Sequence, residues 1–587
     1  MNLLSPGDVA FLLYDWLDVE ELCRHDRYGE HSRETFDAAL DLAATIARDH
    51  FAPHNRLADA HEPTYDGKQV QMIPEPRAAL AVLARSGLLA AGMDHAVGGA
   101  QLPQVVATAC SAWLQAANVA TWAYAGLTVA NANLIQRFGT AEQVEQWVLP
   151  MLEGRFHGTM CLSEPQAGSS LADIATRAEP QPDGTYRLRG HKMWISGGDH
   201  ELGENIVHLV LARIDGAQAG VRGLSLFLVP KFLLDDDGSV GERNDVATAG
   251  LNHKMGFRGT TNAILNFGEG AGAVGHLVGE PNAGLAQMFH MMNEARIAVG
   301  GQAAALGCTA YLKSLDYART RRQGRRAGTD PTAPQDRIAD HPDVRRMLLA
   351  QKVYAEGSLA LVLYCGRLLD ERVTATDEDQ ARDLDLLLDL LTPVAKSWPS
   401  QWCVTANDLA IQVLGGYGYT RDYDLEQHYR DNRLNPIHEG TTGIQALDLL
   451  GRKVRMEKGR ALDVLERRIR ATLSKAEAAD EEARAFAATV GRTWYDLREV
   501  TRQIHATDDP DRLANATLYL EAFGHTVVGW IWLDLLLACG GADDPLRNGK
   551  RHAARFFHRY ELPRVRAQLD LLGSRDRTTV DVAPEWL

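Results

Sequence analysis

The apolar residues of this 587-residue chain change their spacing twice, and this change limits the folds that are open to it. From residue 34 to about 158 they recur at helical spacing, interrupted by prolines. Between 159 and 280, short apolar runs predict strands, and Asp183-Gly184 predicts a hairpin turn between two of them. Helical spacing then returns. The chain is therefore expected to be α+β and mostly α.

This order predicts five parts, in line with a length well above that of a single hydrophobic core. In the fourth part, a long helix is expected to open with Asp340 as an acidic cap ahead of Pro342. The expected parts are an N-terminal helical extension over 1–33, an N-terminal α domain over 34–158, a middle β domain over 159–280, a C-terminal α-helical bundle over 281–455 and an additional C-terminal helical domain over 456–587.

Charge and cysteine content exclude several classes of protein. The net charge of −16 argues against nonspecific nucleic-acid binding as the main task. The seven cysteines form no C-x-x-C pair, so we expect no metal site and no disulfide framework, but reduced, mostly buried thiols in a cytoplasmic protein.

The first 21 residues lack a basic start and carry five acids, so they do not read as a signal peptide. The spacing of Phe11, Leu12, Leu13, Trp16 and Leu17 predicts a short amphipathic helix that packs on the body. No run of about 18 uninterrupted apolar residues is present, so no transmembrane segment is expected.

The turn around Glu439 is the strongest candidate for chemistry. Its carboxylate precedes Gly440, which lets the backbone approach a ligand closely, and Thr441 or Thr442, either of which can cap a following helix. The apolar residues before it would help to desolvate the acid and raise its basicity. Taken alone, such an acid is more often a solvated group at a helix N-terminus.

Other segments accompany this turn in a fixed order. They are Met160–Ser170 (MCLSEPQAGSS), Trp194–Gly198 (WISGG) and Gln412–Tyr419 (QVLGGYGY). Together with Ile437–Gln445 (IHEGTTGIQ), they resemble the FAD-dependent acyl-CoA dehydrogenase family over roughly residues 35 to 455. The extra C-terminal block resembles the extended subgroup typified by 3-methylmercaptopropionyl-CoA dehydrogenase. The implied fold is an N-terminal helical domain, a middle β domain and a C-terminal four-helix bundle, followed by an additional helical domain.

The resemblance implies oxidation of a saturated acyl-CoA to the trans-2-enoyl-CoA. Glu439 matches the base that removes the α proton. No side chain accepts a hydride, so a redox cofactor is obligatory, and the family uses FAD. The expected partners are an acyl-CoA substrate, electron-transfer flavoprotein and a second copy of the chain in a homodimer.

The resemblance also implies the remaining site residues. Those expected to contact FAD are Met160, Leu162, Ser163, Trp194, Ser196, Arg321 and Thr441 and, from a neighbouring subunit, Gln412, Gly415 and Gly416. Those expected to contact the acyl-CoA are Ser169, Asn293, Arg296 and Gly440. The chain departs from the family pattern at Gln166, at Ser170 and at Asn293, where an acid is usual.

Two alternative functions stay open at this point. An acyl-CoA oxidase would reoxidise the same flavin with dioxygen. A DNA-associated or regulatory flavoprotein on this scaffold would use the basic residues between 452 and 470, although acids intersperse them. Acyl chain length is not readable, and candidates run from methylthiopropanoyl-CoA to fatty acyl-CoAs. The apolar run Val527–Leu533 is expected to bury against the body or a partner subunit.

Overall fold

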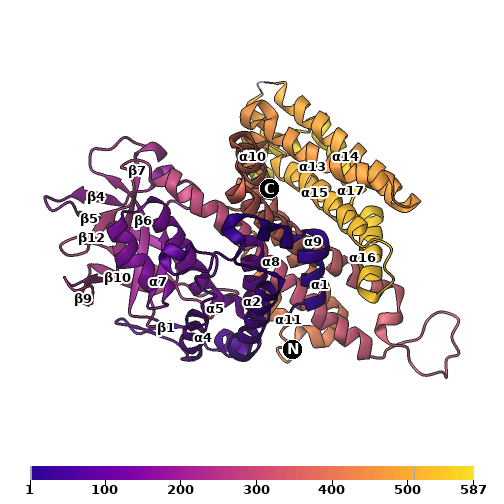
Figure 1. Cartoon of the computed structure of the whole chain (residues 1–587), viewed down its shortest axis with the longest axis horizontal. Helices are drawn as coiled ribbons and strands as arrows, with labels where there is room; N and C mark the ends of the chain where they lie inside the picture. The colour runs from indigo at the N-terminus through magenta and orange to yellow at the C-terminus, as the bar shows by residue number, and fades with distance from the viewer. Residues whose placement is uncertain (1–2, 508) are drawn as a thin grey trace. The chain divides into compact units, whose positions relative to one another are not determined.

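The computed structural model describes residues 3–507 and 509–587, so Met1 and Asn2, the start of the expected N-terminal extension, lie outside the described residues. The chain forms two compact units. The helical unit contains Met1–Ser32, Pro103–Ala112 and Arg296–Leu587, and the mixed unit contains Arg33–Leu102 and Trp113–Ala295. The division falls within two long helices, α5 (Gln104–Phe138) and α8 (Gly284–Thr320) (Figure 1).

The mixed unit begins with the predicted helices. Helix α5 kinks at Asn118, whose side-chain oxygen accepts a hydrogen bond of 3.0 Å from the Thr121 N–H and so caps its second half. The other elements here are α2 (Arg33–Ile46), η4 (Ala47–Phe51), η5 (Ala52–His54), α3 (Asn55–Ala60), β1 (Thr64–Tyr65), β2 (Val70–Gln71), α4 (Glu75–Arg85), η6 (His95–Val97), α6 (Ala141–Gln143), η7 (Val144–Val148) and α7 (Leu149–Leu152).

The predicted strands follow, and five of them close a ring. Strand β5 pairs with β12, β12 with β7, β7 with β6, β6 with β4, and β4 with β5 again. Strand β3 adds to β6, and β11 and β10 extend from β5. The strands are β3 (Phe156–Cys161), β4 (Arg177–Pro180), β5 (Tyr186–Ser196), β6 (Asn205–Ile214), β7 (Leu224–Pro230), β10 (Val246–Leu251), β11 (Asn262–Phe267) and β12 (Ala273–Leu277), with a separate pair β8 (Phe232–Leu234) and β9 (Val240–Arg243) and the short turns η8 (Leu171–Asp173) and η9 (Val221–Gly223).

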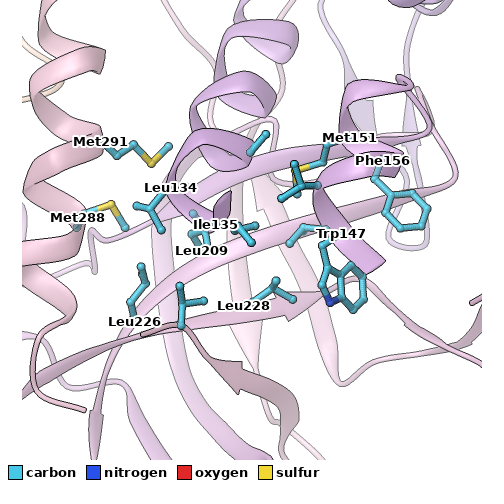
Figure 2. Packing of buried hydrophobic residues seen from close by; sticks show 14 of the residues in the cluster. Leu134, Ile135, Trp147, Met151, Phe156, Leu209, Leu226, Leu228, Met288 and Met291 are labelled. Carbon is cyan, nitrogen blue, oxygen red and sulfur yellow. The ribbon is translucent and has the colours of Figure 1, made fainter. Parts of the chain in front are cut away.

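The hairpin predicted at Asp183-Gly184 joins β4 to β5, with Gly184 in the left-handed region at φ +85°. The first eight residues of β6 are all buried. Because alternate residues of a strand point to opposite sides of a sheet, both faces of β6 are covered. Leu209 points into a core with helical residues Leu134 and Met288, whereas Val210 belongs to a second core inside the ring. Figure 2 shows the first of these cores.

The helical unit contains the predicted bundle: the later part of α8, then η10 (Ile338–Asp340), α9 (Pro342–Thr374), α10 (Glu378–Leu414), η11 (Gly415–Tyr419), α11 (Leu425–Asn432) and α12 (Thr442–Gly451). The prediction that Asp340 caps α9 is wrong. The N-cap residue is His341, and the Asp340 carboxylate instead pairs with Arg337 at 3.2 Å and Arg345 at 3.3 Å. Arginine forks close by compete for the carboxylate that would otherwise bond the helix N–H groups.

Helix α10 carries two prolines in its interior, Pro393 and Pro399. A proline has no N–H, so the carbonyl four residues earlier loses its helical partner. For Pro399 that carbonyl belongs to Ala395, and Gly300 of α8 lies directly against it. A Cβ on Gly300 would lie 1.9 Å from the Ala395 oxygen. Glycine at this position therefore lets α8 and α10 approach closely.

The C-terminal helices pack around α15, which Figure 1 shows beside α13, α14 and α17. They are η12 (Lys453–Gly459), α13 (Arg460–Glu477), α14 (Glu481–His505), η13 (Pro510–Leu513), α15 (Ala516–Ala538), α16 (Pro545–Phe556), η14 (Phe557–Glu561), α17 (Arg564–Ser574), α18 (Thr578–Asp581) and η15 (Pro584–Trp586). The N-terminal extension forms α1 (Pro6–Ala10), η1 (Phe11–Trp16), η2 (Val19–Arg24) and η3 (Asp26–Tyr28) in the same unit, with its predicted apolar face buried.

Helix α15 is long and apolar enough to cross a membrane, yet most of it is buried within this chain. The Val527–Leu533 run packs inside the helical unit. Trp532 donates a 3.3 Å hydrogen bond to the Val353 carbonyl, and Gly357 makes room for its indole. Burial of this run against a partner subunit is therefore wrong, because the chain's own helices already cover it.

Candidate active site

Glu439 lies in a strained turn immediately before α12. Its φ is +52° and that of Gly440 is +87°, so two successive residues occupy the left-handed region, which costs free energy for a residue with a Cβ. The buried Gln445 side chain donates to the carbonyls of Glu439 at 3.2 Å and of Gly440 at 3.5 Å. Thr441 caps α12 by accepting from the Ile444 N–H at 3.4 Å. These contacts hold the backbone of the turn in place.

Glu439 is half-buried and lies among charged side chains. Burial raises the pKa of Glu439, while the cations Arg296 and Lys396 oppose that rise. Arg296 is almost completely buried on α8, and its Nη1 atom lies 3.6 Å from Oδ2 of Asp448 on α12. A half-buried carboxylate with a raised pKa and nearby cations has the properties of a general base.

Trp194 owes its position to a β-bulge. Between Lys192 and Ile195, strand β5 has one residue more than the facing strand β11. Trp194 takes φ +66°, and 57% of its surface is exposed, which is unusual for an indole at the end of a strand. The bulge turns the ring away from the core. Ser196, two residues later, accepts a 3.2 Å hydrogen bond from Asn262.

The end of β3 is tied to β5. The Met193 N–H donates to the Ser163 carbonyl at 3.0 Å, and Nζ of Lys192 donates to the Leu162 carbonyl at 3.0 Å. Met160, Leu162 and Ser163 are all partly exposed there. The structure thus brings these three residues together with Trp194 and Ser196.

Lys192 and Glu164 form a buried ion pair that the sequence did not reveal. Glu164 also accepts from the Ala175 and Thr176 N–H groups at 2.8 and 3.1 Å, which folds the loop after β3. Burial alone would raise the pKa of Glu164, but Lys192, the Thr176 hydroxyl and the Ala175 N–H lower it to about 2. Ser169 lies on the exposed part of this loop, and the neighbouring Ser170 hydroxyl bonds to Asp173.

A second group of expected FAD contacts gathers in the helical unit. The Arg321 guanidinium lies 5.8 Å from the centre of the Tyr417 ring, and Gly415, Gly416 and Gln412 are exposed beside it. A Cβ on either glycine would meet nothing within 4 Å, so a ligand can reach this backbone. A cavity of about 520 Å³ adjoins them, lined by Lys313, Asp316, Tyr317, Arg319, Thr320, Leu414, Tyr423, Asp424 and Leu425.

The expected residues thus form three groups. The Trp194 group consists of Met160, Leu162, Ser163, Trp194 and Ser196, and it lies in the mixed unit together with Asn293. The Arg321 group consists of Arg321, Gln412, Gly415 and Gly416, and it lies in the helical unit, as does the Glu439 turn with Arg296. The sequence missed Lys396, Gln445, Lys192 and Glu164. Lys396 had a usable signal, because it is a lone cation within the apolar stretch from Leu390 to Trp398.

Comparisons with known proteins identify the family of the chain. Family models describe successive parts of the chain as the acyl-CoA dehydrogenase N-terminal domain over 33–155, the middle domain over 159–268, the C-terminal domain over 282–454 and an acetyl-CoA dehydrogenase C-terminal-like region over 465–583. The broad-specificity linear acyl-CoA dehydrogenase FadE5 of Mycobacterium tuberculosis is 34% identical, with 98% of each chain covered. The chain belongs to the acyl-CoA dehydrogenase family.

Further relatives support the same family. The 3-methylmercaptopropionyl-CoA dehydrogenase of Ruegeria pomeroyi is 36% identical, covering 88% of this chain and 87% of that one. Among solved structures, Caenorhabditis elegans ACDH-11 in complex with C11-CoA superposes with a TM-score of 0.77 at 20% identity, covering 97% and 96% of the two chains. An acyl-CoA dehydrogenase from Bacillus anthracis complexed with FAD gives 0.74 at 19% identity, covering 98% and 95%. The last two show the fold.

Acyl-CoA dehydrogenases depend on FAD, and the residues of this chain fit that cofactor. The exposed Trp194 ring offers a flat apolar surface beside a hydroxyl and the partly exposed end of β3, which suits a planar heteroaromatic ring. Arg321 beside the accessible backbone of Gly415 and Gly416 suits a pyrophosphate. The chain is an FAD-dependent acyl-CoA dehydrogenase.

Proposed function

We propose that this enzyme oxidises a linear acyl-CoA to its trans-2-enoyl-CoA with Glu439 as the general base. The carboxylate accepts the α proton of the thioester, so an O–H bond forms as the C–H bond breaks. FAD, when bound, supplies the acceptor for the hydride that leaves the β carbon. The Trp194 group would hold the flavin ring, and the Arg321 group the pyrophosphate.

The position of Glu439 carries this proposal. A solvated helix-capping acid would have neither a left-handed backbone nor a pKa raised by burial. Gln445 donates to the backbone carbonyl of Glu439 and not to its carboxylate, which stays available to a substrate. Gly440 gives the thioester close access to the turn, and Arg296, Asn293 and Ser169 are the proposed contacts of the CoA portion.

The decisive test is Glu439→Gln, which keeps the size of the side chain and removes its basicity. Anaerobic bleaching of the flavin by acyl-CoA should slow by at least ~10³-fold, in the range for loss of a general base. Glu426→Gln, which changes a half-buried acid paired with Arg430 on α11, is the matched control and should keep the wild-type rate. Equal bleaching by Glu439→Gln and wild type would disprove the assignment.

The substrate class is proposed from the relatives, which are named for broad-specificity linear, methylmercaptopropionyl and butyryl substrates. We infer a preference for unbranched short-to-medium chains, with a thioether tolerated in place of a methylene. A panel of butyryl-, octanoyl-, isobutyryl- and methylthiopropanoyl-CoA tests this. Faster turnover of the branched isobutyryl-CoA than of the linear members would contradict it.

We also propose electron-transfer flavoprotein as the oxidant of the reduced enzyme, and a homodimer as the assembly. Reoxidation with product bound should be fast with electron-transfer flavoprotein and slow in air. Fast reoxidation in air would instead identify an oxidase. Light scattering of the holoenzyme should give twice the 64.5 kDa chain mass.

A further inference from the structure

Lys396 is a fully buried lysine on α10, beside the close approach of α8 and α10. It follows Ala395, whose carbonyl faces Gly300, and Arg296 lies one helical turn before Gly300. The contact that glycine permits therefore brings Arg296 and Lys396 to the same region. The Lys396 Nζ atom has no hydrogen-bond partner among the described residues.

A buried cation needs a counter-charge, because its desolvation is costly. Two of the nearby acids are already engaged. Asp389 pairs with Lys453 at 2.8 Å, and Asp448 pairs with Arg452 at 2.7 Å as well as with Arg296 at 3.6 Å. Glu439 is the anion that acts on Lys396.

Building on the proposed function, we propose that Lys396 is a positioning residue for the base. Its ammonium group favours the ionised form of the half-buried Glu439 carboxylate. When Glu439 takes the α proton, the pair changes from two opposite charges to a single cation. Lys396 itself contacts neither substrate nor flavin in this role.

The electrostatics agree with this geometry. Burial lowers the pKa of Lys396 to about 7, with Glu439 raising it and Arg296 lowering it further. Burial, and to a smaller extent Lys396, lowers the pKa of the half-buried His438 to about 3. The His438 imidazole is therefore neutral. The other charged groups that face this cluster are Arg296 on α8, Asp389 on α10, Asp448 and Arg452 on α12 and Lys453 on η12.

The test is the pH profile of kcat/KM for the holoenzyme with butyryl-CoA. Lys396→Met removes the charge at similar volume, so the acid limb should move up by about one pH unit, which is a tenfold loss of kcat/KM below it. Lys396→Arg should restore the limb to near its wild-type position. Lys475→Met, which removes an exposed charge on α13, is the control and should leave the profile unchanged. An acid limb for Lys396→Met that coincides with wild type would overturn the proposal.

A titration that needs no turnover separates this proposal from the assignment of the base. In protein labelled with [δ-¹³C]glutamate, the signal that Glu439→Gln removes should titrate at higher pH in Lys396→Met than in wild type. Lys396→Gln is the substitute if the methionine variant does not fold, and the same shift is required of it. An active Glu439→Gln enzyme would refute the assignment of Glu439 as the base. An unshifted ¹³C titration in Lys396→Met would refute the proposed role of Lys396.

Discussion

The Nζ atom of Lys192 lies 2.9 Å from Oε1 of Glu164, and both side chains are almost completely buried. Lys192 also donates to the carbonyls of Leu162 and Leu211, so one ammonium group joins β5, β6 and the loop after β3. The residues expected at the flavin ring stand on two of these segments. The ion pair is therefore a structural support of the proposed flavin site.

Lys192→Met should destabilise the protein by about 3–5 kcal/mol, because it leaves the Glu164 carboxylate buried without its counter-charge. Urea unfolding of the apoprotein measures this loss, and the purified variant should also retain less FAD. Adding Glu164→Gln should recover part of the stability, since no buried charge then remains. A single variant within about 1 kcal/mol of wild type would show that the pair is not needed.

The same pair predicts an acid dependence of stability. The pKa of Glu164 falls from 4.5 to about 2 on folding, so the contribution of the carboxylate is present above pH 4.5 and is lost as pH falls toward 2. The full effect is about 3 kcal/mol, at 1.36 kcal/mol per pKa unit. Between pH 4.5 and 2, the range set by this shift, wild type should lose unfolding free energy more steeply than the Lys192→Met/Glu164→Gln double variant. Parallel curves would contradict this.

Gly440→Ala should reduce both stability and turnover. The new Cβ would lie 2.5 Å from Nε2 of Gln445 at a φ of +87°, so the turn that holds Glu439 must shift. We expect a loss of about 1–3 kcal/mol from strain and at least ~10-fold in kcat. Gly459→Ala has a similar φ of +96° with open space around it, so it should cost only about 1 kcal/mol and leave kcat unchanged. Equal kcat values for the two variants would rule out a role for the turn.

A buried ionic cluster joins the N-terminal extension to the C-terminal helices. Lys550 of α16 pairs with Asp8 of α1 and, at 2.8 Å, with Glu356 of α9, which also pairs with Lys352. Lys550→Met should cost about 3–5 kcal/mol of unfolding free energy and expose the N-terminal segment to proteolysis. The exposed Asp15–Arg547 pair also links the N-terminal extension, through η1, to α16, so Asp15→Asn should change stability by less than about 1 kcal/mol. If Lys550→Met kept the wild-type free energy of unfolding and its N-terminal segment stayed protected from protease, the prediction would be contradicted.

The family and the α, β, α order were readable from the sequence, because they depend on local patterns; the assignment of Glu439 as the base stays a prediction. The hairpin at Asp183-Gly184 and the Thr441 cap are set by residues within a few positions of each other. The prediction that Asp340 caps α9 was wrong because the Asp340 carboxylate pairs with Arg337 and Arg345. A capping pattern in the sequence does not include such competing partners.

The sequence by itself determined which segments are helices or strands and which acid stands in the E-G-T turn. Only the tertiary structure decided what surrounds that acid. Lys396 is isolated in the sequence, and it comes into the region of Arg296 because Gly300 and the Ala395 carbonyl, which Pro399 leaves without a helical partner, let two helices meet closely. Both cations act on the pKa of Glu439. Likewise, Lys192 on β5 pairs with Glu164 in the loop after β3, 28 positions earlier in the chain. Burial and charge pairing depend on distance in space, which one-dimensional spacing does not encode.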